Sequence, residues 1–243
     1  MILKQNIKVY ATPRETAKAF ADILVDYCSN RPSEEVITIA LSGGSTPKLL
    51  FELLAREYAG KLPWERIHLF WGDERCVPPD HTESNYLMTK QALLDKVAIP
   101  EQNIHRILGE NRPKEEAIRY SNEIKQHVQE FNGLPSFDIN LLGLGTDGHT
   151  ASIFPNQMGL LTSGNICEVA EYPETGQKRI TLTGKVLNNA KNTFFLVTGE
   201  SKKEKVSDIL EEAPHAKEYP ANYIAGDRVN YILDEAAAQL LKV

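Results

Sequence analysis

Four short segments of the sequence combine glycines with charged or hydroxyl side chains. They are residues 42–47, 72–76, 143–152 and 198–203, and each follows an apolar run of the kind that forms a buried strand. Glycine lets the backbone approach a ligand closely. The Asp, Arg, Lys and His residues in these segments are types that bind anions or transfer protons. We therefore expect the chemistry of this protein to reside in these four segments.

The first segment predicts an anion-binding turn. Gly43 and Gly44 are followed by the hydroxyl residues Ser45 and Thr46, and Pro47 marks the start of a helix. Free backbone N–H groups and the helix dipole favour a bound phosphate at such a start. The segment lacks the Gly-Lys-Ser/Thr ending of a Walker A loop. A tight turn with a hydroxyl cap is the alternative interpretation.

The third segment, residues 143–152, contains a candidate general base. His149 can transfer protons near neutral pH, and a carboxylate as close as Asp147 can fix its tautomer; a structural histidine is the alternative. The segment also contains a GxGxxG pattern, with Glu168 about 20 residues further on. Pro155 follows too soon for the long helix of a dinucleotide site. A nicotinamide dehydrogenase therefore stays only as an alternative that a cofactor titration would decide.

The second and fourth segments supply charge at strand ends. Asp73 can act as an acid or base, and Arg75 can bind a phosphate or carboxylate; a solvated loop with a local ion pair is the alternative. Lys202 lies in the first turn of an expected helix, where the dipole disfavours a cation. A bound anion would explain this lysine, although a surface lysine is also compatible with the pattern.

Other catalytic and metal signatures are missing from the sequence. No serine lies in the GxSxG pattern of α/β-hydrolases. The histidines show no HExxH or comparable ligand spacing; they are His68, His81, His105, His127, His149 and His215. The residues by themselves predict an enzyme for a small phosphorylated substrate that uses His149 and needs no cofactor and no metal.

The elements that position these segments alternate along the chain. Strands are expected at residues 7–10, 36–41, 67–71, 139–142, 193–197 and 230–233. Helices are expected at residues 13–28, 47–58, 84–95, 114–130 and 201–210, and after residue 233. This alternation predicts an α/β fold: a single-domain, Rossmann-like parallel-sheet sandwich with helices on both faces, spanning residues 1–243. Ligands bind outside the carboxyl ends of such strands, which is where the four segments lie.

Composition narrows the classes of function. The 243 residues include 27 Lys and Arg against 33 Asp and Glu, a net charge of −6. This acidic balance argues against a nucleic-acid partner. No apolar run approaches the ~20 residues of a membrane span, and the N-terminus has no leader-peptide pattern. The widely spaced Cys28, Cys76 and Cys167 suit reduced thiols and a cytoplasmic location.

Taken together, the motifs resemble the 6-phosphogluconolactonase family, within the wider group that includes glucosamine-6-phosphate deaminases. The resemblance covers roughly residues 5–240. It rests on five motifs in order: residues 41–47, 71–75 with 84–86, 143–155, 179–183 and 199–202. Each motif alone is weak, but five of them at these separations are specific.

The resemblance implies hydrolysis of 6-phospho-D-glucono-1,5-lactone to 6-phosphogluconate, the second step of the oxidative pentose phosphate pathway. His149, oriented by Asp147, would act as the general base. The substrate would contact Gly43, Gly44, Ser45, Thr46, Asp73, Arg75, Arg179 and Lys202. No cofactor is implied, and the protein would be a monomer or small homo-oligomer whose partner is a small molecule.

Two alternatives come from the same group. A deaminase or isomerase would be similar but would carry an acidic residue five positions after the histidine, where this chain has Phe154. A non-catalytic sugar-phosphate sensor would usually carry a DNA-binding segment, and nothing basic or helix-turn-helix-like is visible in the sequence. The intact Asp147 and His149 also argue against a sensor.

Overall fold

A central parallel sheet organises the computed structural model, which describes residues 6–242. Within these residues the sheet has seven strands in the order β1-β12-β11-β8-β2-β3-β5. Their bounds are β1 (Ile7–Tyr10), β12 (Val229–Asp234), β11 (Thr193–Val197), β8 (Ile139–Leu142), β2 (Ile37–Leu41), β3 (Ile67–Trp71) and β5 (Ile104–His105). The predicted α/β parallel sheet is confirmed. The start of the chain, where no leader peptide is expected, lies mostly outside the described residues.

The central strands read as continuous apolar runs because helices and loops cover both of their faces. Every residue of β2, β8 and β11 is buried. The helix after β1 is α1 (Pro13–Ser29), and its start follows the expected local chemistry: the Thr12 hydroxyl accepts a hydrogen bond from the Glu15 N–H at 3.2 Å, and Pro13 occupies the first helical position.

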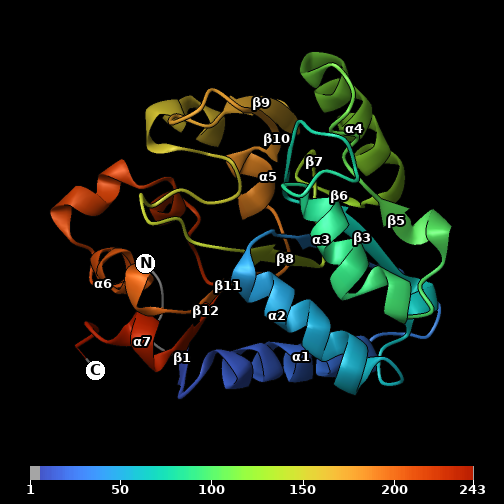
Figure 1. Cartoon of the computed structure of the whole chain (residues 1–243), viewed down its shortest axis with the longest axis horizontal. Helices are drawn as coiled ribbons and strands as arrows, with labels where there is room; N and C mark the ends of the chain where they lie inside the picture. Colours follow the sequence, from blue (N-terminus) through green and yellow to red (C-terminus); the bar gives the residue numbers. More distant parts are fainter. Residues whose placement is uncertain (1–5, 243) are drawn as a thin grey trace.

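Helices lie on both sides of the sheet. Figure 1 shows α1 and α2 (Ser45–Leu53) side by side below the central strand β8, and α4 (Pro113–His127) above it. The remaining α-helices are α3 (Asn85–Ala92), α5 (Gly184–Asn188), α6 (Lys203–Leu210) and α7 (Glu235–Ala238). No helix within residues 6–242 is long and apolar enough to cross a membrane.

Several helix boundaries differ from those predicted. Helix α2 begins at Ser45 and continues as a π-helix over Leu54–Tyr58. The helix expected from residue 201 begins as a 3₁₀ turn, Glu200–Lys202, before α6 starts. Helix α3 ends at Ala92, and a separate 3₁₀ turn covers Leu94–Lys96. These differences arise at helix ends, where the local hydrogen-bond pattern changes without altering the apolar periodicity.

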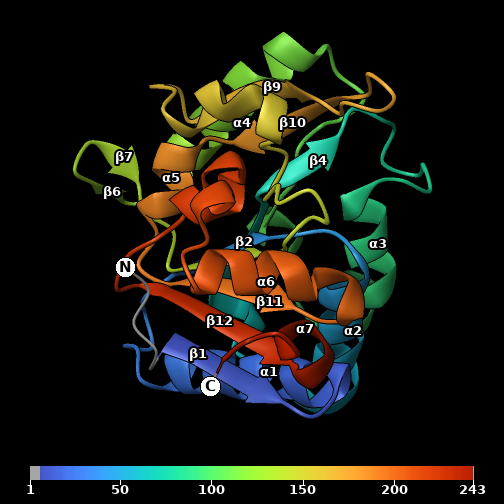
Figure 2. The same cartoon turned by 90° about the vertical axis from the view of Figure 1, so that its left-hand side faces the viewer.

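A second, antiparallel sheet was not predicted. It contains β4 (Asp73–Arg75), β10 (Lys178–Leu182) and β9 (Cys167–Glu171), in the order β4-β10-β9. Both views place β9 and β10 above the parallel sheet (Figures 1 and 2). These strands are short and rich in charged residues, so their sequence lacks the apolar pattern of a buried strand. A two-stranded ribbon, β6 (Glu130–Phe131) with β7 (Leu134–Pro135), is a further small element.

Candidate active site

A pocket of about 250 Å³ lies at the carboxyl ends of the central strands. Each of the four segments singled out in the sequence contributes to its wall. The lining residues are Ser42, Gly43, Gly44, Asp73, Arg75, Asn85, Gly143, Leu144, Gly145, Thr146, His149, Ala151, Arg179 and Lys202. The fold therefore brings together segments that are separated by up to 160 positions along the chain.

His149 faces this pocket and is held by Asp147. The His149 Nδ1 lies 2.6 Å from Asp147 Oδ1, and the same oxygen accepts the backbone N–H of His149 at 3.1 Å. Burial raises the pKa of the Asp147 carboxyl, but the hydrogen bond and charge of His149 lower it further, so the net shift is downward. An ionised carboxylate only accepts hydrogen bonds, so Nδ1 carries the proton and Nε2 keeps a lone pair. This tautomer leaves Nε2, with its lone pair, as the proton-accepting atom of the ring.

Two glycines make room for this pair. A Cβ atom on Gly145 would overlap the His149 ring and come within 2.6 Å of Asp147 Oδ1. Gly148 has φ of 87°, in the left-handed region, and a Cβ atom there would lie 2.5 Å from the Tyr219 ring. The turn therefore requires glycine at both positions. The GxGxxG pattern is explained by this packing, since no α-helix follows it before Pro155 within the described chain.

Three cations line the pocket. Arg75 on β4 lies directly opposite Arg179 on β10, and the Nε atom of each guanidinium is buried and has no hydrogen-bond partner among residues 6–242. Burial and the neighbouring Arg75 both lower the pKa of Arg179. Burial also lowers the pKa of Lys202, against the attraction of Asp147. Buried like charges beside one another are costly unless an anion compensates them, so this wall is suited to a negatively charged ligand.

The start of α2, in the first of the four segments, adds backbone N–H donors to the pocket. Gly44 is the N-cap residue, with φ of 105°, and no side chain caps the helix. The hydroxyl cap considered from the sequence is therefore wrong, and the first N–H groups of α2 are left for a ligand. Gly43 and Gly44 line the pocket, whereas Ser45 and Thr46 do not. The Thr46 hydroxyl instead lies 2.7 Å from the hydroxyl of Thr198.

The acidic residues after β3 have structural partners. Asp73 is 5% exposed and Glu74 is 2% exposed, so the solvated loop considered for this segment is wrong. Asp73 borders the pocket, but its Oδ2 accepts a hydrogen bond from the Ser152 hydroxyl at 2.6 Å. Glu74 accepts the backbone N–H groups of Asn85 and Tyr86 at the start of α3. Asp73 is therefore part of the wall rather than a free acid or base.

Phe154 closes the site behind the histidine. Its side chain is fully buried, and its ring centroid lies 4.9 Å from that of His149 and 5.8 Å from the guanidinium carbon of Arg179. An apolar ring here restricts the imidazole without offering a second carboxylate. At the position where the resemblance implies an acidic residue in deaminases, this chain therefore has a buried phenylalanine that packs against the imidazole.

Sequence reasoning missed Asn85. Its side-chain Nδ2 donates to the Asp73 carbonyl at 3.0 Å, and its Oδ1 lies where a Cβ atom on Gly43 would be. Asn85 therefore joins the first two segments of the pocket wall. In the sequence Asn85 belongs to the motif of residues 84–86, but its place after the helix-capping Ser84 indicates only a helix start.

Comparisons with known proteins agree with this geometry. The family model described as glucosamine-6-phosphate isomerases/6-phosphogluconolactonase matches residues 11–233. A 6-phosphogluconolactonase from Treponema pallidum is 43% identical over 203 residues, which cover 83% of this chain and 84% of the relative. One from Haemophilus influenzae is 44% identical over 208 residues, covering 84% and 88% respectively. The solved 6-phosphogluconolactonase of Trypanosoma cruzi superimposes with a TM-score of 0.87 at 33% identity, covering 100% of this chain and 99% of that one.

Proposed function

Because the chain belongs to the glucosamine-6-phosphate isomerase/6-phosphogluconolactonase family, we propose that it hydrolyses 6-phospho-D-glucono-1,5-lactone to 6-phospho-D-gluconate. This reaction is the second step of the oxidative pentose phosphate pathway. The observation that carries the proposal is that His149, hydrogen-bonded to Asp147, lines the same pocket as Arg75, Arg179 and Lys202. A lactone with a phosphate group needs both features.

In the proposed mechanism His149 Nε2 takes a proton from water as the water oxygen attacks the lactone carbonyl carbon. The tetrahedral intermediate then collapses, the bond from this carbon to the ring oxygen breaks, and His149 returns the proton to that oxygen. The Asp147 carboxylate orients the imidazole and stabilises its protonated form. General-base assistance of this kind contributes about 10²–10⁴-fold.

The oxyanion of the intermediate needs hydrogen-bond donors. Gly143 and Leu144 line the pocket in the same segment as His149, so we propose backbone N–H groups of this loop as the donors. The Gly145 N–H is not one of them, because it donates to the His149 carbonyl at 2.8 Å. One such donor contributes about 10²–10³-fold. A lactone is an activated ester that hydrolyses slowly in water by itself. A base and an oxyanion site are therefore sufficient for the acceleration required.

The phosphate is proposed to bind between the start of α2 and the three cations. Gly43 and Gly44 supply close backbone approach, and Lys202 with the paired guanidiniums of Arg75 and Arg179 supplies charge. The unpartnered Nε atoms support this assignment, because buried guanidinium donors are normally satisfied. Neither Ser45 nor Thr46 is needed as a direct contact.

The remaining proposals concern the setting of the enzyme. Cys28, Cys76 and Cys167 are free thiols, which fits a cytoplasmic location. The net charge of −6 fits a small-molecule substrate better than a nucleic acid. Size-exclusion chromatography would determine whether the protein is a monomer or a small homo-oligomer.

A direct assay tests the proposed function. The lactone is generated in situ from glucose 6-phosphate, and formation of 6-phosphogluconate is compared with and without the protein. We expect a rate well above spontaneous hydrolysis. A rate equal to the spontaneous one would refute the proposal, and ammonia release from glucosamine 6-phosphate would instead indicate the deaminase activity.

A further inference from the structure

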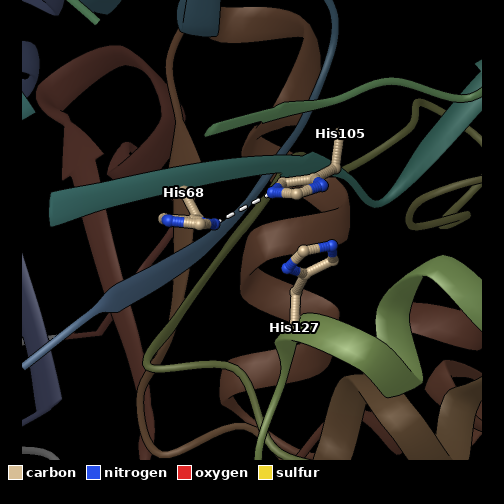
Figure 3. Close-up of side chains that lie close together, drawn as sticks. All are labelled: His68, His105 and His127. Atoms are coloured by element: carbon tan, nitrogen blue, oxygen red, sulfur yellow. Dashed lines mark hydrogen bonds between the residues drawn. The ribbon is translucent and has the colours of Figure 1, made fainter. Parts of the chain in front are cut away.

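Three histidines that the mechanism does not use converge on one point (Figure 3). One ring nitrogen of His68, His105 and His127 each lies within 4.8 Å of those of the other two. His68 comes from β3, His105 from β5 and His127 from the last turn of α4. They are 37 and 22 residues apart in sequence, which is why no ligand spacing is visible there. We propose that these residues form a binding site for a divalent transition-metal ion, best suited to Zn²⁺.

The rings already face one another at nearly the required distance. His68 Nδ1 lies 2.9 Å from His105 Nε2. Tetrahedral zinc with Zn–N bonds of about 2.0–2.1 Å separates its nitrogen ligands by about 3.3 Å. A small adjustment of the His68 and His105 rings is therefore sufficient. The His127 nitrogen lies within 4.8 Å of the other two, and a rotation of this side chain, which is 35% exposed, would bring it to the ligand distance.

His105 contacts a carboxylate, Glu123, as the imidazole of a metal-binding histidine usually does. His105 Nδ1 lies 2.7 Å from Glu123 Oε1, on the far side of the ring from His68. A histidine that ligates zinc generally donates its second N–H to a carboxylate, which fixes the tautomer. Glu123 thus directs the lone pair of His105 Nε2 towards His68. Glu123 also lies 3.5 Å from His127 and 3.6 Å from Arg119.

His68 and His105 favour their neutral forms, which are the forms that bind a metal ion. Burial, reinforced by His105 and His127, lowers the pKa of His68 to about 4, and burial lowers the pKa of His105. In the metal-free arrangement a proton between His68 Nδ1 and His105 Nε2 makes their hydrogen bond. The ion would take the place of that proton, which moves to Nε2 of His68 by tautomerisation. Neither His68 nor His105 changes its net charge in this exchange.

The surroundings favour a cation and give it access. His127 is the last residue of α4, and the carbonyl end of a helix attracts positive charge. His68 and His127 also border a cavity of about 460 Å³ that includes Thr38 and Asp138. Water in this cavity would complete the coordination shell of three imidazoles, a ligand set typical of zinc.

The site is separate from the active-site pocket. Thr38 and Asp138 lie at the amino ends of β2 and β8, whereas the pocket that contains His149 lies at the carboxyl ends of the same strands. A bound ion would join β3 and the edge strand β5 to the end of α4. We therefore expect it to stabilise the fold and to leave the proposed hydrolytic residues untouched.

Zinc titration of the intact, EDTA-treated protein tests the site. We expect one Zn²⁺ per chain at this cluster, a rise in Tm on its addition, and with Co²⁺ the intense visible bands of a tetrahedral complex with nitrogen ligands. Glu123→Gln should weaken binding about 10–100-fold. His127→Ala should weaken it at least as much, and His127→Gln serves as a second variant if the first fails to fold.

Two controls locate the ion. The exposed His81→Ala tests nonspecific imidazole binding, and His149→Ala tests the active-site pocket; both should bind Zn²⁺ like the wild type. The proposal is overturned if the wild type does not saturate with zinc or gives an octahedral Co²⁺ spectrum. It is equally overturned if His127→Ala and His127→Gln both keep the wild-type affinity, or if His149→Ala abolishes binding. Each readout is independent of lactone hydrolysis.

Discussion

Asp147 Oδ1 accepts two hydrogen bonds from a single residue, the backbone N–H of His149 at 3.1 Å and its ring Nδ1 at 2.6 Å. The two contacts fix both the position and the tautomer of the imidazole. Because the donors belong to one residue only two positions away, the arrangement is local to the turn. The rest of the fold supplies the pocket into which the free ring nitrogen points.

This relationship predicts different losses for different substitutions. His149→Ala should lower kcat by about 10²–10⁴-fold with little change in KM, because it removes the base and not the phosphate contacts. Asp147→Asn should retain more kcat than Asp147→Ala. The backbone N–H of His149 orients the amide oxygen of asparagine to accept from Nδ1, so only the negative charge is lost.

Steady-state kinetics on the in situ lactone measure these three variants. Equal kcat values for Asp147→Asn and Asp147→Ala would show that Asp147 does not orient the ring. A wild-type kcat in His149→Ala would remove His149 from the mechanism.

Gly145→Ala should disable the base without removing it. The new Cβ atom would overlap the His149 ring and push it from Asp147. A displacement of about 1 Å can cost about 10²-fold in rate, so we expect a fall in kcat of that order. Gly60→Ala is the matched control, because no described residue other than Gly60 and its two chain neighbours lies within 4 Å of the point that its new methyl group would occupy, and its φ is not in the left-handed region. Unchanged kcat in Gly145→Ala would contradict the packing argument.

Lys202→Ala should act mainly on substrate affinity. A charge-assisted hydrogen bond contributes about 1.5–3 kcal/mol, so its loss raises KM by roughly tenfold to a hundredfold. The neighbouring Lys203→Ala is the control, since the Lys203 ammonium contacts Glu200 and Gln239 instead of the pocket. Inhibition by inorganic phosphate should weaken in parallel for Lys202→Ala. An unchanged KM would exclude Lys202 from the phosphate site.

Asp138 should make the free energy of unfolding depend on pH in the acidic range. Its carboxylate accepts hydrogen bonds from the Thr38 N–H at 2.9 Å and from Lys191 at 2.8 Å. Burial raises its pKa, but these partners lower it further, so the folded-state pKa lies below the usual 3.8. The unfolded chain therefore takes up the proton first, and the contribution of Asp138 is complete above about pH 3.8 and is lost as the pH falls below it.

Urea unfolding of the wild type and of Asp138→Asn measures this contribution. At pH 7 the variant should be less stable by about 1–3 kcal/mol, because it leaves donors of Thr38 and Lys191 poorly paired. The difference should shrink as the pH falls below 3.8. Asp26→Asn, at an exposed position on α1, is the control. A difference that stays constant across this range would contradict the linkage.

The amino-acid sequence by itself determined six of the seven described strands of the central sheet and most of its helices; the two-residue strand β5 was not predicted. Runs such as residues 37–41 and 193–197 are apolar apart from one threonine each, which indicates strands buried on both faces. It also determined that four glycine-containing segments follow strand ends, and that Asp147 and His149 are close enough to pair. These features depend on local spacing, which a linear chain displays directly.

Only the tertiary structure decided what meets across the fold. The antiparallel strands β4 and β10 set Arg75 opposite Arg179, 104 positions apart. The turn into α2 directs Thr46 to Thr198 and leaves Gly43 and Gly44 at the pocket. His68, His105 and His127 likewise come together through strand pairing and helix packing. Such contacts depend on sheet register and on the direction of side chains, which arise when distant segments pack and which local spacing does not encode.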